Sequence, residues 1–471
     1  MKRALVIAML LLAQVTQAMT LNEYLGVVEN KNKNIQALTV FQEEADLNEE
    51  AGDLALVPVL TAGASYLSDR SPANQFVLFG ANEAKVAQYS LGLGKQFSSG
   101  TAIQLSAGVT DSRFPGLSFP GVEDQFTTGT LGIAFSQSLW RDFFGRATRL
   151  RWERQKAATI AEKSSYDLQK RVELIKAEGA FWDYMYALEG VRIARSSLGR
   201  SKRIETWTRR RVNDGISDRA DYLQSQALVS ARQLQLVSAE DDLAAAKRQV
   251  RDFLELSDSD PFPDLKGDLS QARSLTSFIQ GKQGKILELE AYLASLNAKA
   301  ASVGARETED AFRPDLVLSG AYNTNSKEDA VDKATQAWLN TDTPTAQVAL
   351  NFTYQFDTSV KSAAKNAARK RAVAARLQSE RKMLESESAW IELNRRYSEM
   401  SKRVEEASRL SNLRLSATKA QSDLFNKGRS ITSNVVLAEE DAADAELTLT
   451  KLQSEQRKME AQGLLFIVVE E

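Results

Sequence analysis

The side chains that most often carry out chemistry are scarce in this sequence. Its 471 residues include no histidine and no cysteine, so the common zinc, haem, iron–sulfur and thiol sites lack their ligands. Nucleophilic sites that depend on a histidine base are excluded for the same reason. Asp258 and Asp260 begin like a calcium loop, but the third acid and the turn glycine are missing. We therefore expect no enzyme, no cofactor and no metal site.

The densest group of charges is a basic run. Lys and Arg together number 60 against 62 Asp and Glu, which gives a formal net charge of −2. The chain therefore lacks the basic excess that is typical of nucleic-acid-binding proteins. We interpret the run as a solvated helix face, with a protein-docking patch as the alternative. Its residues are Arg200, Lys202, Arg203, Arg209, Arg210 and Arg211.

The first residues resemble an export signal. Lys2 and Arg3 precede an apolar run over 4–13, and Thr16-Gln17-Ala18 forms a small-residue cleavage site. This pattern predicts a signal peptide over 1–18. Neither the apolar run nor any later stretch is long enough to cross a bilayer as a helix. We expect an exported chain that is periplasmic, secreted or inserted as a β-barrel.

Two long segments predict helical rods. The chain has 8 prolines, and the segments 121–260 and 345–471 contain none of them. Apolar residues recur there at three- and four-residue spacing and form a narrow stripe of coiled-coil type. At about 1.5 Å per residue, each rod would be roughly 100 Å long. The predicted helices are the rods 145–213 and 359–427, the returning helices 218–256 and 432–466, and an opening helix 20–57.

Each predicted rod ends at a turn that contains glycine. The first turn reads Asn213-Asp214-Gly215 and the second reads Asn426-Lys427-Gly428. Glycine is favoured just after a helix because it adopts the left-handed conformation without strain. We therefore expect two helix–turn–helix tips.

The segments that contain proline show a different period. Apolar residues alternate with small or polar ones, as in Leu131, Ile133 and Phe135. This period of two predicts strands within 58–139 and 314–357. A soluble antiparallel sandwich would show the same alternation. The export signal and strands of about ten residues favour a membrane barrel.

The two halves of the chain repeat one order of elements: helix, strands, rod, glycine turn, helix. The first repeat covers 19–256, a linker covers 257–270, and the second repeat covers 271–471. The first half also carries a hairpin over 88–110 that the second half lacks. This hairpin belongs either to a barrel wall or to a flap outside it.

The repeated order resembles the outer-membrane efflux protein family, the TolC-like channels. The resemblance is carried by the junction Gln137-Ser138-Leu139-Trp140-Arg141-Asp142-Phe143-Phe144-Gly145, by the first turn with Ile216-Ser217 and Asp221, and by the second turn with Arg429-Ser430. Two positions depart from the family pattern. Ser138 stands where a proline is usual. An acidic residue often follows each tip glycine by six positions, which is Asp221 in the first half but Asn434 in the second.

The resemblance implies a membrane β-barrel joined to a long α-helical coiled-coil barrel. Two structural repeats per chain would close as a homotrimer, usually with twelve strands. It also implies a location in the bacterial outer membrane, with helices that extend into the periplasm. Four to six strands cannot close a barrel alone, and an open sheet edge is not tolerated in lipid, so physical reasoning also requires several chains.

The function that the resemblance implies is that of the outer-membrane channel of a tripartite efflux or type I secretion system. Such a channel is a passive export duct that docks a periplasmic adaptor (membrane fusion) protein and an inner-membrane pump. The expected docking tips are Asp214, Gly215, Ile216, Lys427, Gly428 and Arg429, and the candidate gate residues are Asp221 and Asn434. The alternative function is a structural periplasmic coiled-coil spacer, or an adhesin-like protein with a small β-head. No nucleic-acid partner is expected.

Overall fold

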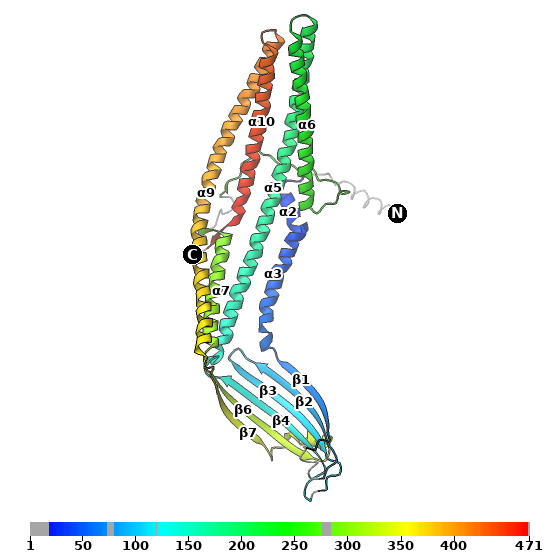
Figure 1. Ribbon diagram of the computed structural model, residues 1–471, viewed down its shortest axis with the longest axis vertical. Coiled ribbons are helices and arrows are strands. Elements are labelled where there is room, and N and C mark those ends of the chain that lie inside the picture. The colour runs from blue at the N-terminus through cyan, green and yellow to red at the C-terminus, as the bar shows by residue number, and fades with distance from the viewer. Residues whose placement is uncertain (1–17, 73–79, 119, 276–283, 470–471) are drawn as a thin grey trace, which may run out of the picture. The chain divides into compact units, whose positions relative to one another are not determined.

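The computed structural model describes residues 18–72, 80–118, 120–275 and 284–469. The predicted signal peptide lies outside the described residues apart from Ala18. The chain divides into two compact units, which Figure 1 shows with their elements labelled. The helical unit comprises 1–43, 162–293 and 380–471, and the sheet unit comprises 44–161 and 294–379. Among the described helices, none has both the length and the apolar character needed to cross a bilayer.

Two very long helices are the main helical elements. The helix α5 (Arg146–Asn213) has 68 residues and α9 (Thr358–Asn426) has 69. Each is followed, after a short turn, by a helix that runs back along it: α6 (Arg219–Phe253) and α10 (Thr432–Ala461). The helices α6 and α10 also contact each other, so the helical unit consists largely of two packed helical hairpins.

The opening helix is interrupted at Asn32. The helix α2 (Leu21–Lys31) begins with the expected capping box of Thr20 and Glu23. Asn32 then has an extended backbone, and its side-chain oxygen accepts hydrogen bonds from the backbone N–H groups of Asn34 (3.0 Å) and Ile35 (3.3 Å). Asn32 thus ends one helix and caps the next, α3 (Lys33–Ala51), which a 3-10 turn, η1 (Gly52–Leu56), follows. The single helix expected over 20–57 is therefore two helices.

In the described part of the second repeat, a short strand precedes the expected helix. Strand β5 (Lys285–Glu288) pairs with β8 (Phe466–Val469), and α7 (Leu289–Ala311) follows it. The helix expected to continue to residue 466 ends at Ala461, where a 3-10 turn, η5 (Gln462–Leu465), leads into β8. Four-residue strands show too little alternation to be recognised in a sequence.

The sheet unit contains a six-stranded antiparallel sheet in the order β1-β2-β3-β4-β6-β7. The strands are β1 (Val59–Asp69), β2 (Ala84–Gln96), β3 (Thr101–Arg113), β4 (Gln125–Ser138), β6 (Asp315–Glu328) and β7 (Thr345–Thr353). The additional hairpin is β2–β3, and it lies between β1 and β4 within the sheet. It is therefore a part of the sheet and not a flap.

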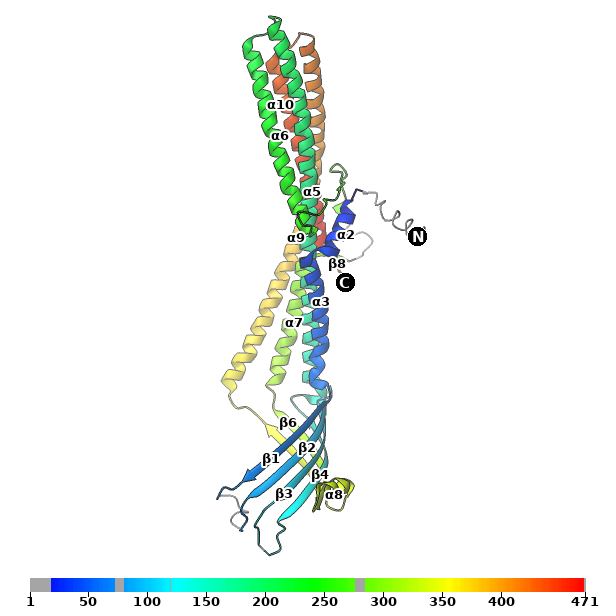
Figure 2. The same cartoon turned by 90° about the vertical axis from the view of Figure 1, so that its right-hand side faces the viewer.

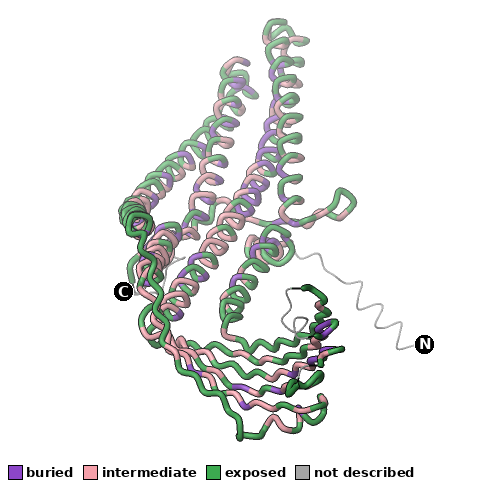
Figure 3. The backbone as a smooth tube through the Cα atoms, turned by 60° about the horizontal axis from the view of Figure 1, so that its bottom comes forward, coloured by how far each residue is buried: buried purple, intermediate pink, exposed green. Residues whose placement is uncertain are grey.

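The two faces of this sheet differ in polarity. The register brings Leu105, Ile133 and Tyr322 into one row on the same face. This face is apolar, with Ile133 49% accessible, and Figure 3 shows the strands in a mixture of the exposed and intermediate colours. The opposite face is hollowed by a cavity of about 360 Å³ and is lined mainly by small and polar residues such as Gln104, Ser136 and Asn351.

The junction from β4 into α5 is shaped by hydrogen bonds of the additional hairpin. The backbone N–H of Ser138 donates to Gly100 O (3.3 Å) in the turn between β2 and β3. A proline at this position, as in the family pattern, has no N–H and could not form this bond. Phe144 (φ 46°) and Gly145 (φ 79°) then both have positive φ angles in the short turn that leads into α5.

The largest core cluster of the helical unit surrounds the middle of α5. Phe181, Trp182 and Tyr184 pack there with Tyr24 from α2 and with Val250 from α6. The rings of Tyr24 and Phe181 lie 5.4 Å apart, and those of Phe181 and Trp182 lie 5.1 Å apart. These aromatic residues hold helices together.

Candidate functional site

The two helix tips have the same backbone. After α5, Ile216 N donates to Arg211 O (2.8 Å) and Gly215 N donates to Val212 O (3.1 Å). After α9, Arg429 N donates to Leu424 O (2.8 Å) and Gly428 N donates to Phe425 O (3.0 Å). Both pairs of bonds are those of a Schellman motif, with glycine at C′. The φ angles of 74° at Gly215 and 73° at Gly428 agree with this assignment.

The expected docking residues are exposed at these turns. Ile216 is 64% accessible, and the other five positions are exposed as well. A Cβ atom added at Gly215 or Gly428 would have no neighbour within 4 Å. The backbone conformation, and not a lack of space, therefore favours glycine at both positions.

The two turns are joined by contacts behind them. Arg211 in α5 donates to Ser430 O (3.4 Å), and its guanidinium lies 5.0 Å from the ring centre of Phe425. A small apolar cluster lies close by and draws on all four long helices. Its members are Ile204, Leu228, Phe425, Val435 and Val436. Arg211, a member of the basic run, thus holds one hairpin against the other.

The two candidate gate residues form local contacts within their own hairpins. Asp221 lies in the first turn of α6, where its carboxylate accepts a hydrogen bond from the hydroxyl of Ser217. A negative charge suits this position because it lies near the positive end of the helix dipole. Asn434 lies in the first turn of α10, is exposed, and donates its backbone N–H to Ile431 O (3.2 Å). The structure does not bring these two residues together.

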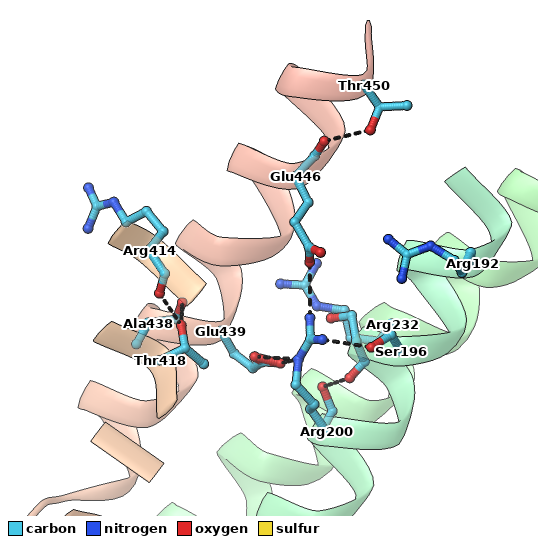
Figure 4. A network of polar contacts seen from close by, with 12 residues as sticks. Arg192, Ser196, Arg200, Arg232, Arg414, Thr418, Ala438, Glu439, Glu446 and Thr450 are labelled. Atoms are coloured by element: carbon cyan, nitrogen blue, oxygen red, sulfur yellow. Dashed lines mark hydrogen bonds and ion pairs between the residues drawn. The ribbon is translucent and has the colours of Figure 1, made fainter. Parts of the chain in front are cut away.

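A buried cluster of charges lies between the hairpins (Figure 4), about two to four helical turns from the ends of the helices at the tips. Arg200 in α5 donates through Nε to the carboxylate of Glu439 in α10, at 2.9 Å from Oε2. Its other nitrogens reach Ser196 Oγ (2.7 Å) and Glu446 Oε2 (3.5 Å). The side chain of Glu439 is fully buried, so this ion pair is largely removed from solvent.

A second arginine lies in the same cluster. Arg232 in α6 is buried and donates to Gln235 Oε1 (2.7 Å). Burial raises the pKa of Glu439, while its hydrogen bond to Arg200 and the charge of Arg232 act in the opposite direction. The cluster therefore places two arginine cations beside the carboxylate of Glu439. Burial disfavours the charged form of this carboxylate, and the two cations favour it.

Four members of the basic run, Lys202, Arg203, Arg209 and Arg210, are exposed as expected, and this cluster corrects our interpretation for Arg200. Arg200 does not lie on a solvated face, because it forms part of the contact between the two hairpins. One feature of the sequence indicates that Glu439 is buried: it lies on the same side of α10 as small and apolar residues. Its partner could not be named, since the two residues are 239 positions apart.

Solved structures similar to this chain are outer-membrane proteins. The outer membrane protein VceC from Vibrio cholerae matches with a TM-score of 0.67 at 11% identity, over 94% of this chain and 95% of that one. The open-state MtrE outer membrane channel of Neisseria gonorrhoeae matches with a TM-score of 0.67 at 16% identity, over 94% and 88%. The CmeC outer membrane channel of Campylobacter jejuni matches with a TM-score of 0.66 at 11% identity, over 94% and 85%.

No family model and no curated protein sequence matches the chain. The similarity is therefore one of fold. It covers 94% of this chain and 85–95% of each of the three solved chains. It confirms, at the level of the fold, the TolC-like resemblance found in the sequence. This chain has the fold of the TolC-like outer-membrane channels.

Proposed function

We propose that this protein is the outer-membrane channel of a tripartite efflux or type I secretion system. It would act as a passive export duct and would catalyse no reaction. The observation that carries the proposal is the open sheet with one exposed apolar face and one hollowed polar face, on a fold shared with outer-membrane channels. A spacer protein with a small soluble head would not need an apolar face of this extent.

The proposal includes a homotrimer. Among the described strands, β1 and β7 each have a partner on one side only. In lipid these edges must be paired, and pairing β1 of one copy with β7 of the next would close a ring. Three copies of six strands give a barrel of eighteen strands, a size that leaves an aqueous channel in porins. The additional hairpin would thus widen the barrel beyond the twelve strands usual for the family.

The polar face of the sheet would then line the lumen. Within the described strands, its side chains are neutral except at the strand ends, where Asp69, Asp315 and Lys327 lie. A wall without fixed charges attracts neither cations nor anions strongly. We infer that the barrel passes solutes by size, and that any preference for charge arises elsewhere in the duct.

The helix tips would dock a periplasmic adaptor protein, and through it an inner-membrane pump. Exposed residues on two turns of the same backbone, held together by Arg211, offer a defined surface for such a partner. The positions assigned to docking are Asp214, Gly215, Ile216, Lys427, Gly428 and Arg429. Asp221 and Asn434 lie just behind them and are assigned to the gate.

Mass measurement and conductance test this proposal. The purified protein should require detergent for solubility, have three times the mass of one chain, and form conducting channels in planar bilayers. A stable monomer that remains soluble without detergent would overturn the proposal and support the coiled-coil spacer.

A further inference from the structure

A short helical segment lies on the apolar face of the sheet. It consists of α8 (Val331–Gln336) and the 3-10 turn η4 (Ala337–Leu339), and it packs on β3, β4 and β6 (Figure 2). Gly129 identifies the face, because residues two apart on a strand share one face and Gly129 therefore lies on the side of Leu131 and Ile133. A Cβ atom added at Gly129 would come within 2.9 Å of Ala334 O, so the segment lies directly over this position.

Hydroxyl groups of the strand hold the segment in place. Ser326 Oγ donates to Ala334 O (2.9 Å), and Thr324 Oγ1 donates to Trp338 O. Both residues belong to the apolar face of β6, and their hydroxyls also lie near backbone oxygens of β4, Leu131 O (3.3 Å) for Thr324 and Gly129 O (3.5 Å) for Ser326. Ala334 is completely buried against the sheet. The segment thus covers the polar end of an otherwise apolar face.

The segment lies where the apolar band ends. Tyr89, Val109, Gly129 and Ser326 form one row across four strands, and the next row contains Asp111 and Glu328. On β6, Thr324 lies eight residues beyond Leu316, at the opposite end of the same face. This separation is roughly 26 Å along a strand, or about 20 Å of height at the ~40° tilt of membrane strands. The distance approaches the thickness of the apolar band of an outer-membrane barrel.

Aromatic residues gather at this level on part of the sheet only. Tyr66 on β1 and Tyr89 on β2 are exposed there, whereas the strands from β3 to β6 carry Val109, Gly129 and Ser326. Over these strands, η4 supplies Trp338, which is half-buried and has its indole nitrogen against the sheet beside Gly129. Tyrosine is enriched at the membrane interface because its ring is apolar and its hydroxyl is polar, so Tyr66 and Tyr89 mark this level.

We propose that α8 and η4 form a membrane-interface anchor that contacts lipid at the boundary between headgroups and acyl chains of the outer leaflet. The proposal rests on the proposed function, since it requires the apolar face to lie in a bilayer. Leu339 is 81% accessible and Val331 is also exposed, so both are free to enter the acyl region. Lys333 of α8 forms an exposed ion pair (2.9 Å) with Asp329, just before the helix, so the segment also has a polar side that can stay in water.

Single-cysteine labelling tests the anchor, because the natural chain has no cysteine. The variants Leu339→Cys, Ile133→Cys and Thr130→Cys carry a fluorescent label on the anchor, on the apolar face of β4 and on its polar face. Each full-length protein is reconstituted into phosphatidylcholine vesicles. Lipid brominated near the carboxyl end of its acyl chains quenches labels near the headgroups, and aqueous iodide quenches labels in water.

We expect the label at 339 to lose most of its emission with the shallow brominated lipid and little with iodide. The label at 130 should respond to iodide alone, and the label at 133 to brominated lipid alone. A label at 339 that behaves like the one at 130, while 133 is quenched by lipid, would overturn the anchor and leave the channel proposal standing. A label at 133 that lipid does not quench would overturn both.

Gly129→Val gives a second test. Its side chain would collide with the backbone at Ala334 and displace α8, whereas valine suits the strand itself. In this background the label at 339 should lose its response to the brominated lipid, and the label at 133 should keep its own. An unchanged response at 339 would show that contact with the sheet does not position the segment.

Discussion

The turn after α5 and the turn after α9 have nearly the same backbone, with equivalent hydrogen bonds and glycine φ angles of 74° and 73°. Their charges are opposite. Residues 214–221 carry a net charge of −2 and residues 427–434 carry +2. The shared backbone follows from the shared task of the two turns, since each reverses the chain between two long helices. The turn conformation does not require these charges, so we attribute the difference in charge to function.

The contact behind the turns distinguishes the two hairpins in another way. The first hairpin contributes the arginines Arg200 and Arg232, and the second contributes the carboxylates Glu439 and Glu446. The two hairpins thus differ in charge at both places with opposite sign: the first is negative at its exposed turn and contributes the cations to the buried contact. The predictions below remove one of these features at a time.

Loss of the buried carboxylate should have the largest effect. Glu439→Ala leaves Arg200 and Arg232 without their nearest anion in a site largely closed to solvent. Breaking a buried pair in this way costs about 3 kcal/mol of folding stability when one partner remains partly exposed. The melting temperature of the purified protein measures this loss. Glu440→Ala, which removes the exposed neighbouring carboxylate, should leave the melting temperature nearly unchanged.

Replacement of the turn glycines should have the next largest effect. Gly215→Val and Gly428→Val each force a branched residue into the left-handed conformation, at a cost of about 1–3 kcal/mol. The strain is confined to the turn, so adaptor binding should weaken more than insertion into the outer membrane. Asparagine tolerates this conformation, and Gly428→Asn should therefore bind the adaptor nearly as well as the natural protein. Equal loss of membrane-inserted protein in all three variants would indicate a role in folding.

Features with a local cause could be predicted from the sequence, whereas contacts between distant residues could not. A glycine after a long periodic helix predicts a left-handed residue because the cause is local, and Gly215 and Gly428 both have it. Alternation likewise predicted the polar and apolar faces of the sheet. The place of the additional hairpin could not be predicted, since a strand's neighbour depends on which edge it meets during folding.

Other features could not be predicted from the sequence, because the segments that form them are short or because the contacting residues are far apart in the chain. Asn32 stands within an otherwise periodic helix, and it acts as a cap only because its own backbone is extended. The six-residue helix α8 is too short to show a helical period, and its position depends on Gly129, 205 residues before Ala334 in the sequence. The pair of Arg200 and Glu439 joins helices of different repeats, so neither residue alone indicates the other.

Reversing the charge of the second turn should have a smaller effect on docking. Lys427→Glu combined with Arg429→Glu makes both turns acidic without altering either Schellman motif. Exposed charges contribute up to about 1 kcal/mol each, so the loss of two should lower adaptor affinity by up to roughly thirtyfold, and less at high salt. Titration of purified adaptor at two ionic strengths measures this change. Lys402→Glu combined with Arg403→Glu, two exposed reversals on α9 away from the turn, is the matched control; an equal loss there would indicate that net charge alone is responsible.

The smallest expected effect concerns the gate. Three copies of Asp221 in a trimer would place three carboxylates around the duct and attract cations, whereas Asn434 contributes no charge. Asp221→Asn should therefore lower the cation preference of single channels, and Asn434→Asp should raise it. The hydrogen bond from Ser217 to Asp221 can also form with asparagine, so the turn should remain intact. Reversal potentials in a salt gradient report the preference, and melting temperature reports the fold. If both variants keep the natural reversal potential, Asp221 serves only the N-terminus of α6, and the charges at the tips act in docking rather than in conduction.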